Sequence, residues 1–230
     1  MACIYENFTI PFPSKSRVSD RAHALLKIKT YIDVGDGTRF DGFPKITFTK
    51  ISKPDALQKS HLILEEFNDC ISIGSNCYID STDISAFHSS KSKLTCAKLL
   101  HNPPGKIRIG DNVSIFCTAI ISYGLVTIGD NSVISAMCTI MDSNGHPTFG
   151  RTYLDEAERI NFSSVTIGKN VWIGINCTVL PGVHIGDNCV IGANAVIRSN
   201  IPENCIAAGN PAKVLKKLPL MINPNTTEND

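Results

Sequence analysis

The chain has 230 residues, 43% of them hydrophobic, with 22 basic and 21 acidic side chains. This length fits one domain with at most a small appendage, and the hydrophobic content is too high for a disordered chain. The net charge of +1 argues against a nucleic acid as an obligate partner.

The N-terminal segment, residues 1–33, is predicted to be partly helical. Residues 16–32 can form a helix that Ser19 caps. The first residues lack a basic start followed by an apolar run, which is the pattern of a secretory signal, so we expect a cytoplasmic protein. In that compartment, nine cysteines without a CxxC pair indicate free thiols rather than a disulfide framework.

From residue 34 onward the sequence follows a six-residue period. Val34, Phe40 and Ile46 form a degenerate first turn of the repeat, and Ile73 and Ile79 continue it. Branched aliphatic residues then recur in two blocks, Ile109, Ile115, Ile121, Ile128, Ile134 and Ile140, and later Ile167, Ile173, Val179, Ile185, Ile191 and Ile197. A period of six fits neither a helix nor a plain strand, but it is typical of very short strands with a corner every six residues. We therefore predict an all-β fold, a parallel β-helix of hexapeptide repeats over residues 34–209.

Two features of the repeat have simple structural interpretations. Cys77, Cys138, Cys177 and Cys189 share one position of the hexad, where a free cysteine fills the core as a small apolar side chain. The uncharged run 112–129 is long enough to suggest a membrane span, but polar residues interrupt it and it keeps the period of six. We expect buried strands there, and no membrane span.

Two insertions are predicted to leave the repeat as loops, at 85–108 and 142–166. The first carries basic residues and no acidic one: Lys91, Lys93, Lys98, Lys106 and Arg108. It is either a solvated loop or a patch for an anionic glycan or nucleotide sugar. The second contains the sequence NGHP, residues 144–147. After the repeat, residues 210–218 are predicted to form a short C-terminal helix that closes the open end of the coil, followed by a frayed tail to residue 230.

The motifs NVWIG, PGVHIG, IGANAVI and AAGNPAKV follow one another in this order within residues 165–218. Together they resemble the hexapeptide-repeat acyltransferases, and most of all the maltose and galactoside O-acetyltransferase branch and its polysaccharide O-acetyltransferase relatives. The resemblance is strong over 109–218, weak over 30–108 and absent before that. It implies a left-handed parallel β-helix, a homotrimer, and acetyl-CoA bound in the cleft between adjacent coils, with no metal.

In this family the interrupting loop carries the catalytic histidine, and His146 in NGHP matches that residue. Moving an acetyl group from a thioester to a sugar hydroxyl needs a base, and a neutral imidazole suits this role near pH 7. Asp142 lies four residues earlier and is a candidate for holding the imidazole tautomer. A plain turn carboxylate is an equal alternative for it.

Trp172 is the only tryptophan and lies at an outward position of the repeat. An exposed indole suggests an interface or a ligand contact, and the resemblance places it against the thioester end of acetyl-CoA. The resemblance also implies cofactor contacts for Ile175, Ala193, Arg198, Ser199, Lys213 and Lys216. The chain departs from the family pattern at Ile175 and Ser199, where the contacts can be through the backbone alone.

The acceptor site is the least defined part of the prediction. Ser122, Tyr123 and Tyr153 are candidates for hydroxyl or stacking contacts with a sugar or glycan. The leading prediction is an acetyl-CoA-dependent O-acetyltransferase acting on a sugar or surface-polysaccharide precursor. A xenobiotic (antibiotic) acetyltransferase and a non-catalytic β-helix scaffold remain alternatives. A metalloenzyme on the same fold would need three converging histidines, and the six in this chain form no close pair.

Overall fold

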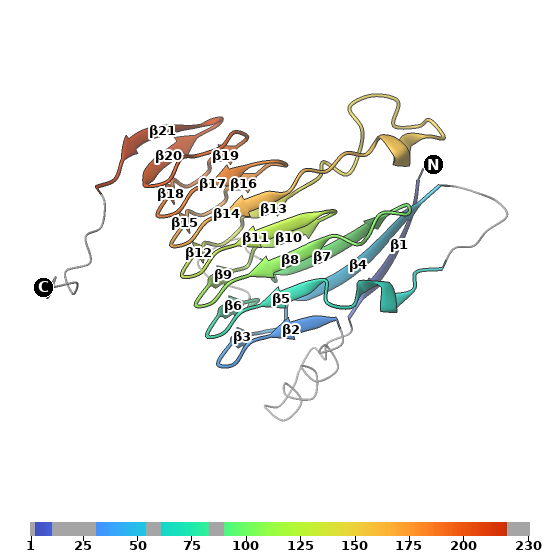
Figure 1. Ribbon diagram of the computed structural model, residues 1–230, viewed down its shortest axis with the longest axis horizontal. Helices are drawn as coiled ribbons and strands as arrows, with labels where there is room; N and C mark the ends of the chain where they lie inside the picture. The colour runs from blue at the N-terminus through green and yellow to red at the C-terminus, as the bar shows by residue number, and fades with distance from the viewer. Residues whose placement is uncertain (1–2, 11–30, 54–60, 83–89, 220–230) are drawn as a thin grey trace, which may run out of the picture.

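The computed structural model describes residues 3–10, 31–53, 61–82 and 90–219. Over these residues the chain is a stack of coils that ascends from β2 and β3 at one end to β20 and β21 at the other (Figure 1). Successive strands visit three sheets in turn, so that three strands complete one coil. The predicted all-β coil with a six-residue period is confirmed.

The three sheets form the faces of the coil. Sheet A contains β1 (Ile4–Thr9), β4 (Lys45–Ser52), β7 (Lys93–Leu99), β10 (Ala119–Ser122), β13 (Thr139–Met141), β16 (Thr178–Val179) and β19 (Val196–Ile197). Sheet B contains β2 (Ile32–Val34), β5 (Ile71–Ile73), β8 (Lys106–Ile109), β11 (Leu125–Ile128), β14 (Val165–Ile167) and β17 (His184–Ile185). Sheet C contains β3 (Arg39–Asp41), β6 (Tyr78–Asp80), β9 (Ser114–Phe116), β12 (Val133–Ile134), β15 (Trp172–Ile173), β18 (Val190–Ile191), β20 (Cys205–Gly209) and β21 (Ala212–Lys217).

Strands in neighbouring coils pair in parallel, and the exceptions among the described strands are the antiparallel pairs β1–β4 and β20–β21. Parallel pairing in register places equivalent residues of successive coils above one another, which explains why the same residue types recur every six positions. On sheet C, for example, Ile115, Ile134 and Ile173 form one fully buried inner column. Each such column removes branched aliphatic side chains from water, which is the main stabilisation of the coil.

The corners of the coil depend on residues that accept a positive φ angle. Asparagine takes this left-handed conformation at Asn76, Asn112, Asn131, Asn170, Asn176, Asn188, Asn194 and Asn204. Their side chains also form ladders, since Asn170 donates to Asn188 at 2.9 Å and Asn188 donates to Asn204 at 3.0 Å. Glycine is needed where coils approach closely: a Cβ on Gly129 would lie 2.7 Å from the backbone of Gly168.

Several predictions about the repeat need correction. Ile120, and not Ile121, is the buried aliphatic residue of its strand, because it follows Ile115 by five positions instead of six. The repeat also starts earlier than residue 34, with β2 at Ile32. The cysteines do fill the core, since all nine are buried.

The segment 85–108 is not simply a loop insertion. Residues 83–89 lie outside the described part, but β7 and the start of β8 belong to sheets A and B. Lys98 pairs at 2.6 Å with Glu66, a residue of the 3-10 helix η1 (Leu64–Phe67). Arg108 donates to the backbone carbonyls of Asp69, Cys70 and Ile107. These contacts give both cations structural partners.

The predicted C-terminal helix is wrong, because residues 212–217 form β21. β20 would otherwise leave one edge of sheet C without a partner, and β21 pairs with it antiparallel. Pairing the backbone N–H and C=O groups of that edge stabilises the strand more than a weak helical preference stabilises a helix. Most of the helix predicted for 16–32 lies outside the described part, which resumes at residue 31, and Ile32 at its end begins β2.

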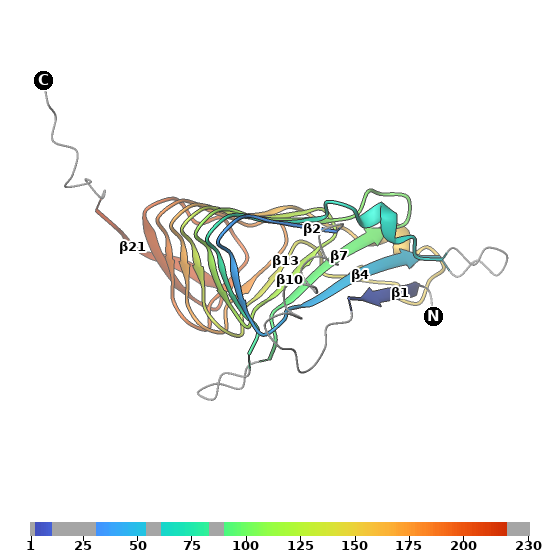
Figure 2. The same cartoon turned by 90° about the horizontal axis from the view of Figure 1, so that it is seen from below.

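Sheet A extends beyond the coil on one side. β4 and β7 are longer than the other strands of the coil, and β1 adds an antiparallel strand at their edge (Figure 2). Cys3, Ile51, Ala97, Leu99, Tyr123, Ala157 and Ile160 bury one another there in a second hydrophobic cluster. Ala157 and Ile160 come from the segment after β13, so this cluster anchors a loop that leaves the coil.

Candidate active site

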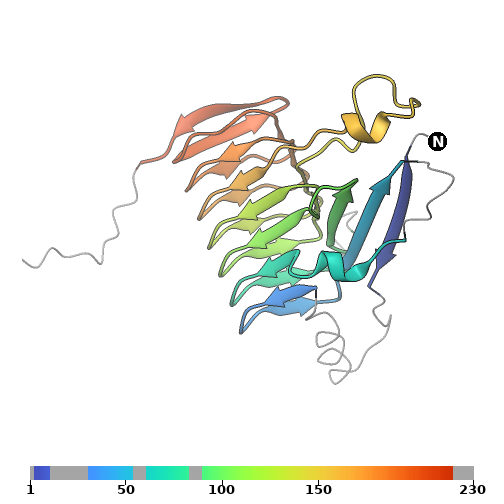
Figure 3. The same cartoon turned by 45° about the vertical axis from the view of Figure 1, so that its right-hand side comes forward.

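The loop of residues 142–164 leaves the coil between β13 and β14, as the break in the repeat predicts. It contains one turn of 3-10 helix, η2 (Glu156–Arg159), and lies at the end of the molecule where β1 begins (Figure 3). We call it the histidine loop. His146 lies within it, and its side chain is 53% exposed.

The imidazole of His146 has a defined partner. Its Nδ1 atom lies 2.8 Å from Oε1 of Glu156, whose side chain is only 4% exposed. A buried carboxylate with one contact to an exposed ring can hold the ring in a single orientation. Sequence reasoning missed Glu156, because it follows His146 by ten positions in a stretch without a period, and only the folded loop brings the two side chains together.

Asp142 does not take the predicted role beside His146. Its carboxylate is fully buried and accepts hydrogen bonds from the Ser122 hydroxyl at 2.8 Å, the Tyr123 N–H at 2.7 Å and the Gly124 N–H at 2.8 Å. These bonds tie the start of the histidine loop to the segment between β10 and β11. The carboxylate that contacts the imidazole is that of Glu156.

The predicted acceptor contacts of Ser122 and Tyr123 do not fit their burial. Ser122 is fully buried, and Tyr123 packs in the second hydrophobic cluster under the loop. Burial, followed by the nearby Tyr5, Asp142 and Cys3, raises the pKa of Tyr123 to about 12. Both residues therefore support the loop from below. Tyr153, in contrast, is exposed near the tip of the loop.

The N-terminal strand also reaches the site, which the sequence did not indicate. Tyr5 of β1 donates a 3.4 Å hydrogen bond to the carbonyl of Gly145, and its ring centroid lies 6.3 Å from that of His146. Burial, and after it the charge of Glu156, raises the pKa of the Cys3 thiol. β1 therefore forms part of the floor beneath the histidine.

A polar hollow of about 370 Å³ lies beside His146, and we call it the histidine hollow. It is lined by Asn144, His146, Pro147, Thr148, Phe149, Glu158, Arg159 and Asn161. All of these belong to the histidine loop. A site of this size next to an exposed imidazole can hold a small polar molecule.

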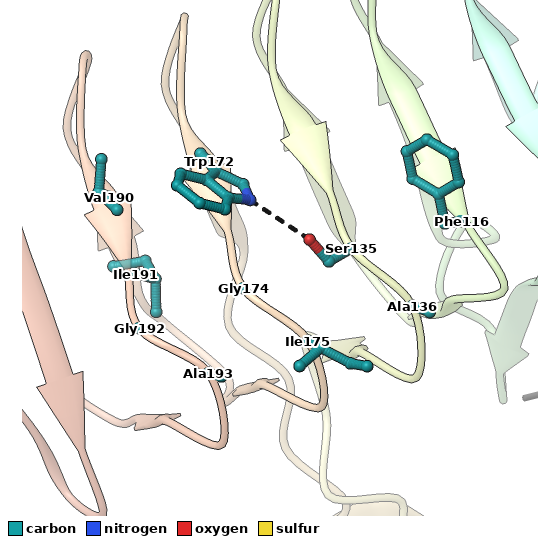
Figure 4. A pocket seen from close by; sticks show the side chains of 10 residues that line it. All are labelled: Phe116, Ser135, Ala136, Trp172, Gly174, Ile175, Val190, Ile191, Gly192 and Ala193. Atoms are coloured by element: carbon teal, nitrogen blue, oxygen red, sulfur yellow. Dashed lines mark hydrogen bonds between the residues drawn. The ribbon is translucent and has the colours of Figure 1, made fainter. Parts of the chain in front are cut away.

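A second, apolar groove of about 460 Å³ follows the corner between sheets C and A, and we call it the tryptophan groove (Figure 4). It is lined by Phe116, Ser135, Ala136, Trp172, Gly174, Ile175, Val190, Ile191, Gly192 and Ala193. Trp172 is 54% exposed, and its Nε1–H donates to the Ser135 hydroxyl at 3.3 Å. Three predicted cofactor contacts, Trp172, Ile175 and Ala193, thus come together in one place.

The remaining predicted cofactor contacts lie outside the groove lining. In register, Trp172 pairs with Val190, Val190 with Ile206, and Ile206 with Lys216. Paired residues share a face of the sheet, so Lys216 lies on the outer face that carries Trp172, about 15 Å away. Lys213, opposite Ala208, lies on the same face. Arg198 and Ser199 are exposed directly after β19.

Neither a metal centre nor a membrane span emerges from the described ranges. Within residues 3–10, 31–53, 61–82 and 90–219, no group of three or more His, Cys, Asp or Glu side chains converges as metal ligands would. In the same ranges, no helix has the length and hydrophobicity to cross a bilayer.

The sequence matches a family model described as "Bacterial transferase hexapeptide (six repeats)" over residues 164–199. It is 35% identical over 158 residues to WbbJ of Escherichia coli K12, a putative lipopolysaccharide biosynthesis O-acetyl transferase; the match covers 66% of this chain and 81% of WbbJ. It is 38% identical over 123 residues to the galactoside O-acetyltransferase of the same organism, with 50% of this chain covered and only 59% of that enzyme.

Among solved structures, the fold resembles AntD, an N-acyltransferase from Bacillus cereus that was solved with dTDP and coenzyme A. The TM-score is 0.60 with 20% sequence identity, over 86% of this chain and 88% of AntD. At this identity the likeness concerns the fold alone.

Proposed function

Because the chain belongs to the hexapeptide-repeat acetyltransferase family, we propose that it transfers an acetyl group from acetyl-CoA to a hydroxyl of a sugar or surface-polysaccharide precursor. The pairing of His146 with Glu156 beside a polar hollow carries this proposal. The names of WbbJ and the galactoside enzyme support oxygen as the acceptor atom and a sugar as the acceptor. The family also supports a left-handed coil, as the resemblance implies.

The chemistry follows from the protonation of the imidazole. Glu156, as a carboxylate, would accept a hydrogen bond from Nδ1–H, which leaves the lone pair of Nε2 free. Nε2 removes the proton of the acceptor hydroxyl while the oxygen attacks the thioester carbonyl. The carbon–sulfur bond then breaks, and the imidazolium returns the proton to the departing thiolate. The charge on Glu156 stabilises the imidazolium in between.

The tryptophan groove is the proposed site of the acetyl-CoA donor. Its walls are apolar, which suits the pantetheine arm, and Trp172 in the lining would pack against the thioester end. Lys216 and Lys213 lie further along the same outer face and suit the phosphates as point charges. Arg198 and Ser199 would meet the nucleotide end, as the family resemblance implies.

We further infer that the active unit is a homotrimer in which two chains build each site. The histidine hollow and the tryptophan groove share no lining residue. Base and donor must nevertheless meet within about 3–3.5 Å at the moment of transfer. A second copy that brings its tryptophan groove to the first copy's histidine loop would satisfy this requirement, and cyclic symmetry would give three such sites.

Replacing His146 with Ala tests the proposed chemistry. Turnover, followed as thiol release from acetyl-CoA with a galactoside acceptor, should fall by roughly a hundredfold to ten-thousandfold. The affinity for acetyl-CoA, measured by calorimetry, should change little, because the imidazole acts on the acceptor. If donor affinity collapses together with the rate, His146 is a binding residue and the proposed role is wrong.

A further inference from the structure

We propose that the histidine hollow binds an uncharged sugar residue of the acceptor and disfavours acidic or phosphorylated sugars. This inference rests on the proposed acetyl transfer to a sugar and names the class of that sugar. It depends on three features of the hollow. An aromatic ring is fixed by a neighbouring guanidinium, the charged side chains already have ion-pair partners, and the neutral polar side chains have no hydrogen-bond partner among the described residues.

The aromatic ring is that of Phe149, which is 71% exposed. The guanidinium of Arg159 lies 5.2 Å from its ring centroid. Arg159 also donates to the carbonyls of Phe149 at 2.7 Å and Gly150 at 2.6 Å, and its bidentate contact with Asp155 fixes the guanidinium plane. The ring is thus held by one face while the rest of it meets solvent. A preorganised apolar surface of this kind suits the CH-rich face of a pyranose.

The charged residues that line the hollow are already compensated. Arg159 is paired with Asp155, Glu158 with Lys53, and His146 with Glu156. Arg159 therefore offers little net positive potential to an incoming anion, and the carboxylate of Glu158 would repel one. A phosphate or carboxylate on the acceptor would lose its hydration without gaining a cation here.

The remaining polar groups are neutral. Asn144, Thr148 and Asn161 are exposed in the lining. Across the described part of the chain, no hydrogen bond holds their side chains. An amide both donates and accepts, as a hydroxyl does, so these side chains match the hydroxyl groups of a sugar.

Binding measured without the donor tests the inference separately from catalysis. The probes are methyl β-galactoside, methyl β-galacturonoside, which carries one negative charge on the same ring, and UDP-galactose. Calorimetry and saturation-transfer NMR on the full-length protein should give the neutral glycoside a Kd at least about tenfold lower than either anion, because an anion would meet the Glu158 carboxylate and no cation without a partner. An equal or stronger affinity for either anion would overturn the inference.

Variants connect this selectivity to the hollow. Phe149→Ala should raise the KM for the galactoside by about tenfold, the range for losing an aromatic contact, and leave the KM for acetyl-CoA unchanged. Leu154→Ala is the matched control, since Leu154 is 78% exposed on the same loop and does not line the hollow. Asn161→Lys should shift the preference toward the galacturonoside, because it adds a cation without a partner.

The outcomes separate this inference from the proposed function. Failure to bind acetyl-CoA would overturn both. Normal acetyl-CoA turnover with a preference for UDP-galactose would overturn the inferred preference for uncharged sugars and leave the proposed acetyl transfer standing. An unchanged galactoside KM in Phe149→Ala would also overturn the inference, since Phe149 would then not contact the sugar. A changed oligomeric state of this variant in light scattering would overturn it too, since Phe149 would then be a contact between copies.

Discussion

In the proposed mechanism, the contact between His146 and Glu156 decides which imidazole nitrogen acts as the base. The mechanism needs Glu156 as a carboxylate, which has no proton to donate, so that Nδ1 carries the hydrogen of the neutral ring and Nε2 is left free. Glu156 is buried, and the second hydrophobic cluster that includes Ala157 fixes the backbone beside it. We therefore propose that Glu156 is a positioning residue that acts through the histidine.

Glu156→Gln should lower kcat by about a hundredfold or more while the KM values of both substrates change little. The glutamine amide can donate to Nδ1, which moves the ring hydrogen to Nε2 and removes the base. Steady-state kinetics measure the rate, and nitrogen NMR of the imidazole reports the tautomer directly. Glu65→Gln, at an exposed site, is the control. An unchanged tautomer in Glu156→Gln would contradict this role.

Asp142 serves stability, and Asp142→Asn should reveal it. The substitution replaces one acceptor oxygen with an NH₂ group that faces hydrogen-bond donors. We expect a loss of about 1–3 kcal/mol in the free energy of unfolding, the usual cost of an unsatisfied buried group. Urea unfolding measures it, with the exposed Asp36→Asn as control. Unchanged stability with a collapse of kcat would instead place Asp142 in catalysis.

At the scale of elements, the repeat made most of the fold predictable from the sequence. Each hexad contributes one short strand and one corner, and in-register stacking requires the same residue types at the same positions. The loop at His146 was predictable for the same reason, as a break in that rhythm. Glu156, Tyr5 and β21 were not predictable, because contacts between distant segments place them and no period marks such contacts.

β21 carries two of the predicted cofactor contacts, Lys213 and Lys216, in a segment that was predicted to be a helix. Lys213→Ala and Lys216→Ala should each raise the KM for acetyl-CoA several-fold, because both side chains lie on the outer face that carries Trp172. Lys217→Ala is the matched control, since Lys217 pairs with the inward-facing Cys205 and lies on the other face of the strand. The effects should shrink as salt increases. An equal effect of all three changes would show a general charge effect rather than a phosphate site.

At the scale of the whole molecule, the fold separates the proposed base, His146, from the proposed donor site, the tryptophan groove. The coil holds the tryptophan groove at the corner between sheets C and A, while the extension of sheet A and the second hydrophobic cluster hold the histidine loop. In the proposed homotrimer, each chain would contribute its histidine loop to one active site and its tryptophan groove to another. The proposal is therefore tested on the assembly rather than on the monomer.

Complementation between two inactive variants tests whether chains share a site. His146→Ala lacks the base and Trp172→Ala lacks the donor contact, so a trimer of either variant should be nearly inactive. In trimers refolded from an equal mixture, a site between neighbours joins an intact histidine loop to an intact groove in about one case in four, by random cyclic assembly. Thiol release should then return to about a quarter of the wild-type rate. A mixture that stays as inactive as its components, although light scattering shows mixed trimers, would place base and donor groove in the same chain.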